Sequence, residues 1–311
     1  MAFKVASRVG GLSDEAFREA FGSEEQCRTA LVRLRWPGGF VCPACGHRGH
    51  CELAGRGLFQ CNRCKSQTSP TAGTIFHATK LPLRLWFAAI HLIVTAKNGV
   101  SSVELARRLG VKQPTAWAMK HKIMGVMARR EGEKQLSGRV EMDDAYLGGR
   151  RSGGKRGRGA SGKTPFVAAV STGPEGRPRK LKLAPVRGFR KREIARGAEH
   201  WLAPGSTVVT DGLGCWGVLG EGTYNHRSVR TGSGPKAARV ASFKWVNTTL
   251  GNIKSAITGT YRKLGPDHAE RYLASFAWRY NRRYHLKTMI TRFVHSAART
   301  NPMPYRILVA G

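Results

Sequence analysis

The chain has 311 residues, with 53 Lys and Arg against 19 Asp and Glu, so its formal net charge is +34. This length allows a substantial core and more than one domain. Such an excess of positive charge favours a polyanionic partner, and nucleic acid is the first candidate. A membrane is disfavoured, because the longest apolar run, residues 83–96, is too short to span a bilayer and contains Arg84 and His91.

The cysteines indicate a metal site near the start of the chain. The first residues lack the apolar core of a signal peptide, which predicts a cytoplasmic protein, where disulfides are rare. A helix is expected over residues 13–36, followed by two Cys-x-x-Cys knuckles at Cys42, Cys45, Cys61 and Cys64. This spacing fits four thiolates around one tetrahedral Zn²⁺. We therefore predict a structural zinc ribbon, against the alternative of four unrelated thiols.

Two amphipathic helices are expected on either side of Gly110, the first beginning at residue 101 and the second running from residue 112 through Ile123. A short Gly-containing turn between two helices is typical of a helix-turn-helix, whose second helix enters the major groove. An ordinary helical hairpin is the alternative, and the net charge favours DNA. The candidate base or phosphate contacts are Gln113, Thr115 and Lys120.

The pattern then changes from helices to strands. Strands are expected at residues 139–146, 165–171, 179–186 and 206–210, with a helix at residues 191–202. Three antiparallel strands, a helix, and a strand parallel to the first begin a ribonuclease-H-like α/β fold. The predicted fold class is therefore a mixed five-stranded sheet with helices, preceded by the ribbon and the small helical segment.

Two of these strands deliver carboxylates. Because side chains alternate across a sheet, Glu141 and Asp143 share one face of the first strand and Asp144 takes the other. Asp211 ends the neighbouring strand, where it can face Asp143. Both Glu141 and Asp143 are able to approach a metal ion, but only Asp143 lies near the end of its strand. The alternatives are a turn or helix cap for Asp211 and an ion pair with an arginine for Asp143.

Three further segments carry candidate contacts to DNA or metal. A helix at residues 242–264 carries Asn247 and Lys254, which lie two turns apart on nearly the same face. The next helix, residues 267–284, presents Arg279, Arg282 and Arg283 as candidates for the DNA backbone. Residues 150–163 form an acid-free loop of Gly, Ser, Lys and Arg that we expect to order on phosphates. Its candidate DNA contacts are Arg150, Arg151, Lys155, Arg156 and Arg158.

Together these motifs resemble bacterial insertion-sequence transposases of the ISXO-like branch. The resemblance rests on the order of the paired knuckles, Val140-Glu141-Met142-Asp143, Tyr146-Leu147-Gly148-Gly149, Thr210-Asp211, Asn247 with Lys254, Gly259-Thr260-Tyr261 and Arg279-Tyr280-Asn281-Arg282-Arg283. That family combines a zinc ribbon with a DDE-type catalytic domain of ribonuclease-H-like fold. The active positions of its Asp-Asp-Asn-Lys subgroup correspond here to Asp143, Asp211, Asn247 and Lys254.

The residues and the resemblance together predict four parts of the chain. Residues 1–79 hold the first helix and the ribbon, and residues 80–135 hold the helix-turn-helix-like segment. The catalytic domain is expected over residues 136–290, and residues 291–311 are expected to form a C-terminal tail.

The resemblance also implies an activity. A transposase binds the terminal inverted repeats of its element and joins them to target DNA, as a dimer or larger homo-oligomer in the bacterial nucleoid. Mg²⁺ or Mn²⁺ would be held by Asp143, Asp211 and Asn247 and would assist in-line displacement at phosphorus, while Lys254 contacts a phosphate. Two alternatives remain: a sequence-specific DNA-binding regulator without catalysis, and a nuclease of the same fold.

Overall fold

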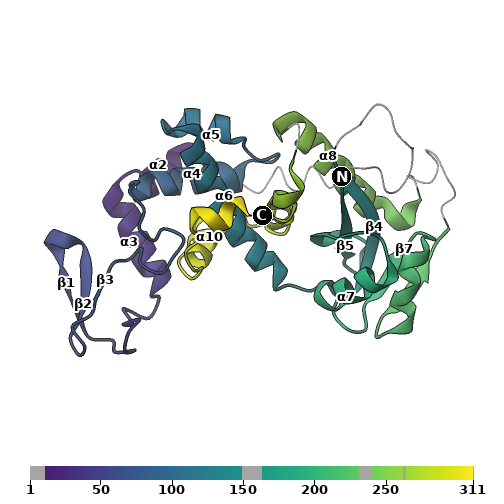
Figure 1. Ribbon diagram of the computed structural model, residues 1–311, viewed down its shortest axis with the longest axis horizontal. Helices are drawn as coiled ribbons and strands as arrows, with labels where there is room; N and C mark the ends of the chain where they lie inside the picture. The colour runs from purple at the N-terminus through teal and green to yellow at the C-terminus, as the bar shows by residue number, and fades with distance from the viewer. Residues whose placement is uncertain (1–10, 149–162, 231–239, 262–263, 311) are drawn as a thin grey trace. The chain divides into compact units, whose positions relative to one another are not determined.

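The computed structural model describes residues 11–148, 163–230, 240–261 and 264–310 (Figure 1). These residues divide into two compact units. The first comprises the chain up to Ala96, Ser102–Val126 and Tyr284–Ala310, and the second comprises Lys97–Ser101 and Met127–Arg283. Among the described residues, no helix combines the length and the apolar character that crossing a membrane requires.

The first unit begins with two helices where the sequence predicts one. α2 (Asp14–Phe21) starts after Ser13, whose hydroxyl accepts a hydrogen bond from the N–H of Ala16. α3 (Glu24–Arg35) starts after Ser23, which forms a reciprocal capping box with Gln26. The new cap at Ser23 provides acceptors for a second helix start, which explains the break in the predicted helix.

A small antiparallel sheet follows, built from β1 (His50–Leu53), β2 (Leu58–Cys61) and β3 (Gln67–Thr68). Its apolar side is a compact cluster in which Phe40 and Phe59 are nearly inaccessible to solvent and Trp36 packs against both. The fold of this segment is that of the predicted ribbon.

The remaining helices of the first unit are α4 (Leu83–Thr95), α5 (Ser102–Leu109), the beginning of α6 (Gln113–Gly132), α10 (Met289–Ala297) and α11 (Tyr305–Val309). The sequence predicts only a tail after residue 290, but α10 packs against α3 and α4. Its Ile290, Phe293, Val294 and Ala297 recur at helical spacing and are buried, and His295 contacts the carbonyl of Leu34.

The second unit is built on a five-stranded sheet with the order β6-β5-β4-β7-β8. β4 and β7 are parallel, as are β7 and β8, whereas β5 pairs antiparallel with both β4 and β6. This topology confirms the predicted mixed sheet and the ribonuclease-H-like fold. The strands are β4 (Arg139–Leu147), β5 (Thr164–Thr172), β6 (Pro178–Pro185), β7 (Thr207–Thr210) and β8 (Asn225–Ser228).

Helices cover both faces of this sheet (Figure 1). One face packs against α7 (Lys191–Trp201) and the 3-10 helix η2 (Gly214–Glu221). The other packs against α8 (Lys244–Ala256) and α9 (Ala269–Tyr280), and α8 continues into a π-helical turn, η5 (Ile257–Tyr261). Residues an odd number of positions apart on β4 enter opposite cores, with Met142 in the first and Ala145 in the second, as expected from the pleat.

A buried ionic cluster joins the end of α6 to β6 and to the end of α9. The carboxylate of Glu131 accepts hydrogen bonds from Asn281 Nδ2 at 2.6 Å and from Arg282 Nη1 at 2.7 Å. Asn281 also bonds the backbone N–H and C=O of Leu181, and Lys182 Nζ donates to three carbonyls at the end of α6. These contacts satisfy the backbone groups of Leu181 on β6 and three carbonyls at and just after the end of α6.

The three arginines expected to face DNA serve this interior instead. Arg282 pairs with Glu131, Arg283 donates to the carbonyls of Pro178 and Arg179, and the side chain of Arg279 is buried. The prediction is wrong for Arg279 and Arg282, because α9 ends at Tyr280 and the chain then turns across β6, whereas Arg283 is partly exposed. Their guanidinium groups lie over aromatic rings of the same segment, namely Phe276, Trp278 and Tyr280.

Candidate active site

The four ribbon cysteines converge on one point. Cys42 and Cys64 have their sulfurs 3.6 Å apart, as do Cys45 and Cys61, and all four lie within 4.8 Å of one another. Tetrahedral Zn–S bonds of about 2.3 Å place sulfurs about 3.8 Å apart, so the set fits Zn²⁺. The backbone N–H groups of Cys64 and Arg63 lower the pKa of Cys61, which favours the thiolate that binds metal.

A second cluster lies at the centre of the five-stranded sheet. One carboxylate oxygen from each of Asp143, Asp144 and Asp211 lies within 4.8 Å of the others, and all three residues are partly buried. The structure therefore brings together Asp143 and Asp211, which the sequence places on neighbouring strands. It also adds Asp144, which alternation along the strand assigns to the opposite face.

The strand register explains why these acids meet. β4 and β7 are paired through Glu141 and Val209, so Asp143 and Asp211 each lie two residues further along parallel strands. The pairing ends there, and the N–H of Asp144 bonds Oδ1 of Asp143 at 2.9 Å. β4 stays paired with β5 through Asp143 and Asp144, but beyond Glu141 no β7 residue pairs with it, and a carboxylate oxygen of Asp144 lies within 4.8 Å of one from each of the other two acids. A pair of acids at the end of a ladder is the signal that identifies Asp144.

The side chain of Asp211 is oriented by its own loop. Its Oδ1 accepts hydrogen bonds from the indole of Trp216 at 2.8 Å and from the N–H of Leu213 at 3.1 Å. The loop therefore includes a turn around Asp211, as the alternative interpretation of this residue supposed, and the same turn holds the carboxylate beside Asp143. His226 on β8 contacts the hydroxyl of Thr210, and burial lowers its pKa, which fits a structural role.

α8 carries the other two predicted residues. Asn247 lies in its first turns and is partly buried, whereas Lys254 lies two turns later and is exposed. The helix packs against β4 and β5 on the sheet face that carries Asp143. Glu141 contacts the start of this helix: its Oε2 accepts hydrogen bonds from the N–H groups of Trp245 and Val246. Its expected approach to a metal ion is thus replaced by a contact with α8.

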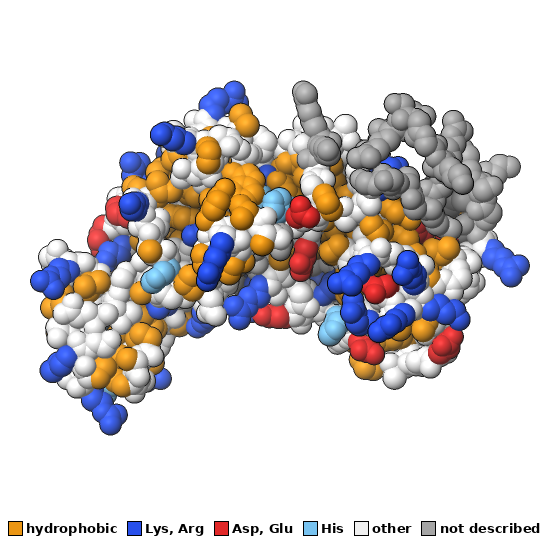
Figure 2. Space-filling view, viewed as in Figure 1, with side chains coloured by type: hydrophobic (Ala, Val, Ile, Leu, Met, Phe, Trp, Pro, Cys, Tyr) orange, Lys and Arg blue, Asp and Glu red, His pale blue; other side chains and the backbone are white. Residues whose placement is uncertain are grey.

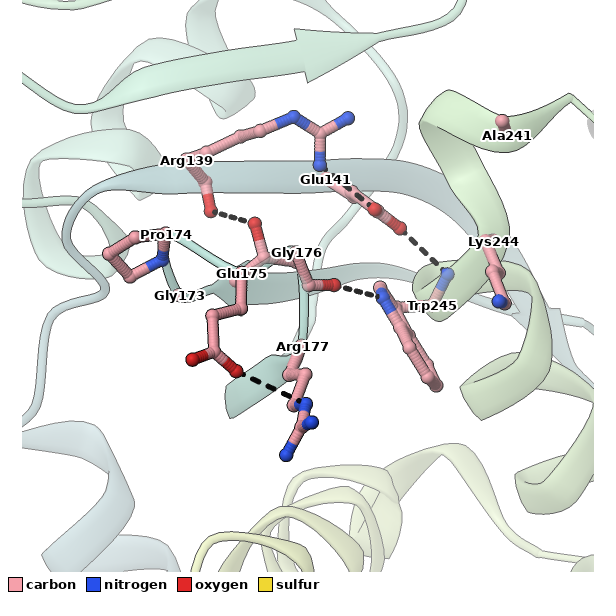
Figure 3. Close-up of a pocket in the computed structure, with 11 residues that line it drawn as sticks. Arg139, Glu141, Gly173, Pro174, Glu175, Gly176, Arg177, Ala241, Lys244 and Trp245 are labelled. Carbon is pink, nitrogen blue, oxygen red and sulfur yellow. Dashed lines mark hydrogen bonds and ion pairs between the residues drawn. The ribbon is translucent and has the colours of Figure 1, made fainter. Parts of the chain in front are cut away.

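Beside that contact lies a pocket of about 390 Å³. Figure 3 shows Arg139 bonded to Glu141 in the lining, and the indole of Trp245 directed at the carbonyl of Gly176 in the turn between β5 and β6. None of Asp143, Asp211 or Asn247 lines this pocket. It is therefore distinct from the acid cluster.

The predicted DNA contacts divide into three groups. Gln113 is exposed at the start of α6, where its amide bonds the hydroxyl of Ser102, and Thr115 is partly exposed. Lys120 is 2% exposed and shares the core-facing stripe of α6 with Ala116 and Ile123, so its prediction as a surface contact is wrong. The loop candidates Arg150, Arg151, Lys155, Arg156 and Arg158 lie outside the described residues.

Comparison with known families gives a match to each of the two segments that carry these clusters. The transposase zinc-ribbon domain matches residues 22–67, and the ISXO2-like transposase domain matches residues 135–281. The chain belongs to the ISXO2-like transposase family. The four cysteines of this transposase lie inside the first match, and Asp143, Asp211 and Asn247 lie inside the second.

A relative supports the same assignment over a longer stretch. The chain is 24% identical over 270 residues to a protein in transposable element ISH50 of Halobacterium salinarum, covering 77% of this chain and 89% of the relative. Membership of the family makes this ISXO2-like transposase a DNA-processing enzyme that binds DNA, and its ribbon cysteines form a structural zinc site.

Proposed function

We propose that the chain is an insertion-sequence transposase that binds the terminal inverted repeats of its element and catalyses metal-dependent cleavage and joining of DNA strands. The observation that carries the proposal is the meeting of Asp143, Asp144 and Asp211 within 4.8 Å at the centre of the sheet. The second unit would perform the chemistry, and the ribbon and the α5–α6 pair of the first would contact the ends.

The donor set fits Mg²⁺ or Mn²⁺. Mg²⁺ prefers a few carboxylates together with phosphate oxygens and water, and its oxygen ligands at about 2.1 Å are separated by roughly 3 to 4 Å. The carboxylate oxygens of Asp143, Asp144 and Asp211 are compatible with this spacing. Asp144 supplies a third negative charge in a site whose fourth member, Asn247, is neutral.

Each residue has a separate task in the proposed reaction. Bound divalent ions supply activation of the attacking oxygen and stabilisation of the leaving oxygen. Asp143 and Asp211 hold the ions from the two parallel strands, and Asn247 offers its amide oxygen from α8. Lys254, exposed on the same side of that helix, contacts a phosphate of the strand.

The surface of the second unit is suited to a DNA backbone. In Figure 2 Lys and Arg side chains gather over α7. Exposed cations at the start of this helix and just before it are Arg187, Arg190, Lys191, Arg192 and Arg196. Such a surface attracts phosphates without reading sequence, which suits target DNA. Joining two ends in one reaction requires a dimer or a larger assembly on the DNA.

A strand-joining assay with DNA that carries the element's ends tests the proposal. Wild-type protein with Mg²⁺ should join ends to target DNA, whereas Asp143→Ala and Asp211→Ala should abolish joining and retain end binding. Asp267→Asn, which removes an exposed acid outside the cluster, is the matched control and should join normally. Cutting without joining would assign the chain as a nuclease, and end binding without either reaction would assign it as a regulator.

A further inference from the structure

The N-terminus of α8 is capped from a distant part of the chain. Neither Phe243, at the N-cap position, nor any local side chain caps this helix, although its first N–H groups need acceptors. Instead, Glu141 Oε2 accepts from the N–H of Trp245 at 2.8 Å and from the N–H of Val246 at 3.0 Å. Glu141 lies 104 residues before Trp245, on the strand that carries Asp143.

Glu141 is itself held in place. Its side chain is 2% exposed, and Oε1 accepts from Arg139 Nη1 at 2.9 Å. The second nitrogen of Arg139, Nη2, donates to the carbonyl of Ser242 at 3.1 Å, just before α8. A buried carboxylate with charged and backbone donors forms strong hydrogen bonds, and its negative charge is favourable at a helix N-terminus. Strand and helix are thus tied by a rigid set of contacts (Figure 3).

A second contact fixes the rotation of α8 about its axis. Successive residues of a helix are turned by about 100°, so Trp245 and Asn247 lie on opposite sides of Val246. Val246 is fully buried and faces the sheet. The indole Nε1 of Trp245 donates to the carbonyl of Gly176 at 2.7 Å, in the turn between β5 and β6. Asn247 is consequently turned toward the other side, where β4 and β7 carry the acids.

We propose that Glu141 is a positioning residue that sets the place of Asn247 relative to Asp143 and Asp211. The inference rests on the proposed function, because it assigns Asn247 to the metal site. A local cap would complete the helix without fixing its distance from the strand. A carboxylate two residues before Asp143 couples the start of α8 to the catalytic strand itself. Asn247 is neutral and holds a cation more weakly than a carboxylate would, so its exact placement matters more. The contact from Glu141 provides that placement.

The test compares Glu141→Gln with Glu175→Gln. Glutamine keeps the size of Glu141 but loses the charge and one acceptor oxygen, whereas Glu175 is an exposed acid of the same pocket that pairs with Arg177. We expect Glu141→Gln to retain zinc and end binding, to lose about 10- to 100-fold in joining, and to need more Mg²⁺ for half-maximal rate. Glu175→Gln should match wild type in all four measurements.

A double-mutant cycle separates positioning from a general loss of stability. If Glu141 acts through Asn247, adding Glu141→Gln to Asn247→Ala should reduce joining and metal affinity little further. If the two losses multiply, or if Glu141→Gln joins strands with unchanged Mg²⁺ dependence, the proposal is wrong. Should Glu141→Gln fail to fold, Trp245→Phe tests the same placement, because it removes the bond to Gly176 and keeps an aromatic ring.

The binding of Mn²⁺, measured by titration calorimetry, distinguishes this inference from the proposed function. Suppose that wild type binds Mn²⁺ through Asp143 but joins no strands. The transposase proposal then fails, and weaker Mn²⁺ binding by Glu141→Gln still supports positioning. Equal Mn²⁺ binding by wild type and Glu141→Gln overturns the positioning role whether or not the chain joins strands.

Discussion

The indole Nε1 of Trp216 donates a 2.8 Å hydrogen bond to Oδ1 of Asp211, and the ring itself is fully buried. A partner of this kind fixes the orientation of a metal-binding carboxylate. We expect Trp216→Phe to raise the Mg²⁺ concentration needed for half-maximal joining by about 10-fold and to lower the joining rate by a similar factor. Asp211 loses the hydrogen bond that orients it, while the core keeps an aromatic ring. Joining measured as a function of Mg²⁺ concentration checks this.

Trp201→Phe is the control for that substitution. Trp201 belongs to the same apolar cluster as Trp216, but it lies on α7 and makes no hydrogen bond to an acid among the residues that the structure describes. Both changes should destabilise the second unit by about 1 to 3 kcal/mol, as expected when a large buried ring becomes smaller. Only Trp216→Phe should shift the Mg²⁺ dependence, so an equal shift in both variants would argue against a role for the indole in orienting Asp211.

Asp144→Asn tests whether the third carboxylate contributes to the metal site. Because the side chain keeps its size and loses its charge, we expect the Mg²⁺ concentration for half-maximal joining to rise about 10-fold. End binding should not weaken, since a negative charge is removed near DNA. Asp267→Asn loses the same charge at an exposed position in the same unit and should leave the Mg²⁺ dependence unaltered.

The sequence predicts most of this fold because its core strands are apolar and its helices are periodic. β4, β5, β6 and β7 lie within one or two residues of their expected bounds, since each is a buried run bounded by turn residues. β8 is missed because Asn225–Ser228 is short and mostly exposed, and an edge strand of this kind has no apolar pattern. α10 is missed as an element because its stripe follows the stretch taken as the end of the catalytic domain.

The sequence predicts the site residues that belong to a local motif. It does not predict the contacts that depend on tertiary packing alone. Asp143 lies in the middle of a recognisable strand, and Asp211 directly follows another. Glu141 looks like a second metal ligand in the sequence, because its partners at the start of α8 are 104 and 105 residues away. Lys120 looks like a surface cation because a single Lys on a helix is usually solvated, but the 116, 119, 120, 123 stripe places it inside. Local patterns do not contain such contacts.

Removal of zinc should affect the ribbon selectively. A closed four-cysteine site couples metal binding to folding, so we expect one zinc per chain and loss of the ribbon in chelator. Cys61→Ser should lose that zinc, since Cys61 is a buried member of the cluster. Cys51→Ser, which changes an exposed cysteine on β1 outside the cluster, should keep it. Zinc content by atomic absorption separates the two variants.

Glu131 should make the second unit sensitive to acid. Burial tends to raise its pKa, but the charges of Arg282 and Lys134 and the hydrogen bonds from Arg282 and Asn281 outweigh burial and hold the pKa below the usual 4.5. A carboxyl with a lowered folded-state pKa adds stability above its unfolded-state pKa, and that stability is lost as the pH falls through the folded-state value. The loss should therefore occur below about pH 4.5.

Glu131→Gln tests this through the pH dependence of unfolding. At neutral pH we expect a loss of about 3 kcal/mol, because Arg282 and Lys134 remain with no carboxylate partner. The loss should shrink as the pH falls below the range in which Glu131 takes up its proton. Glu133→Gln removes an exposed acid just beyond the end of the same helix, paired with Arg129 and Arg130, and should cost less than about 1 kcal/mol at any pH.

Lys254 should act on DNA and leave metal binding unchanged. It is exposed two turns after Asn247 on α8, so its ammonium group can reach a phosphate beside the metal site. We expect Lys254→Gln to reduce joining about 10-fold at constant Mg²⁺ dependence and to lower the salt slope of DNA binding by about one. Lys180→Gln removes the same charge from an exposed position on the edge strand β6 and should leave joining unchanged. Equal loss of joining in both variants would show that Lys254 acts only through the overall charge. A shifted Mg²⁺ requirement in Lys254→Gln alone would instead place Lys254 at the metal site.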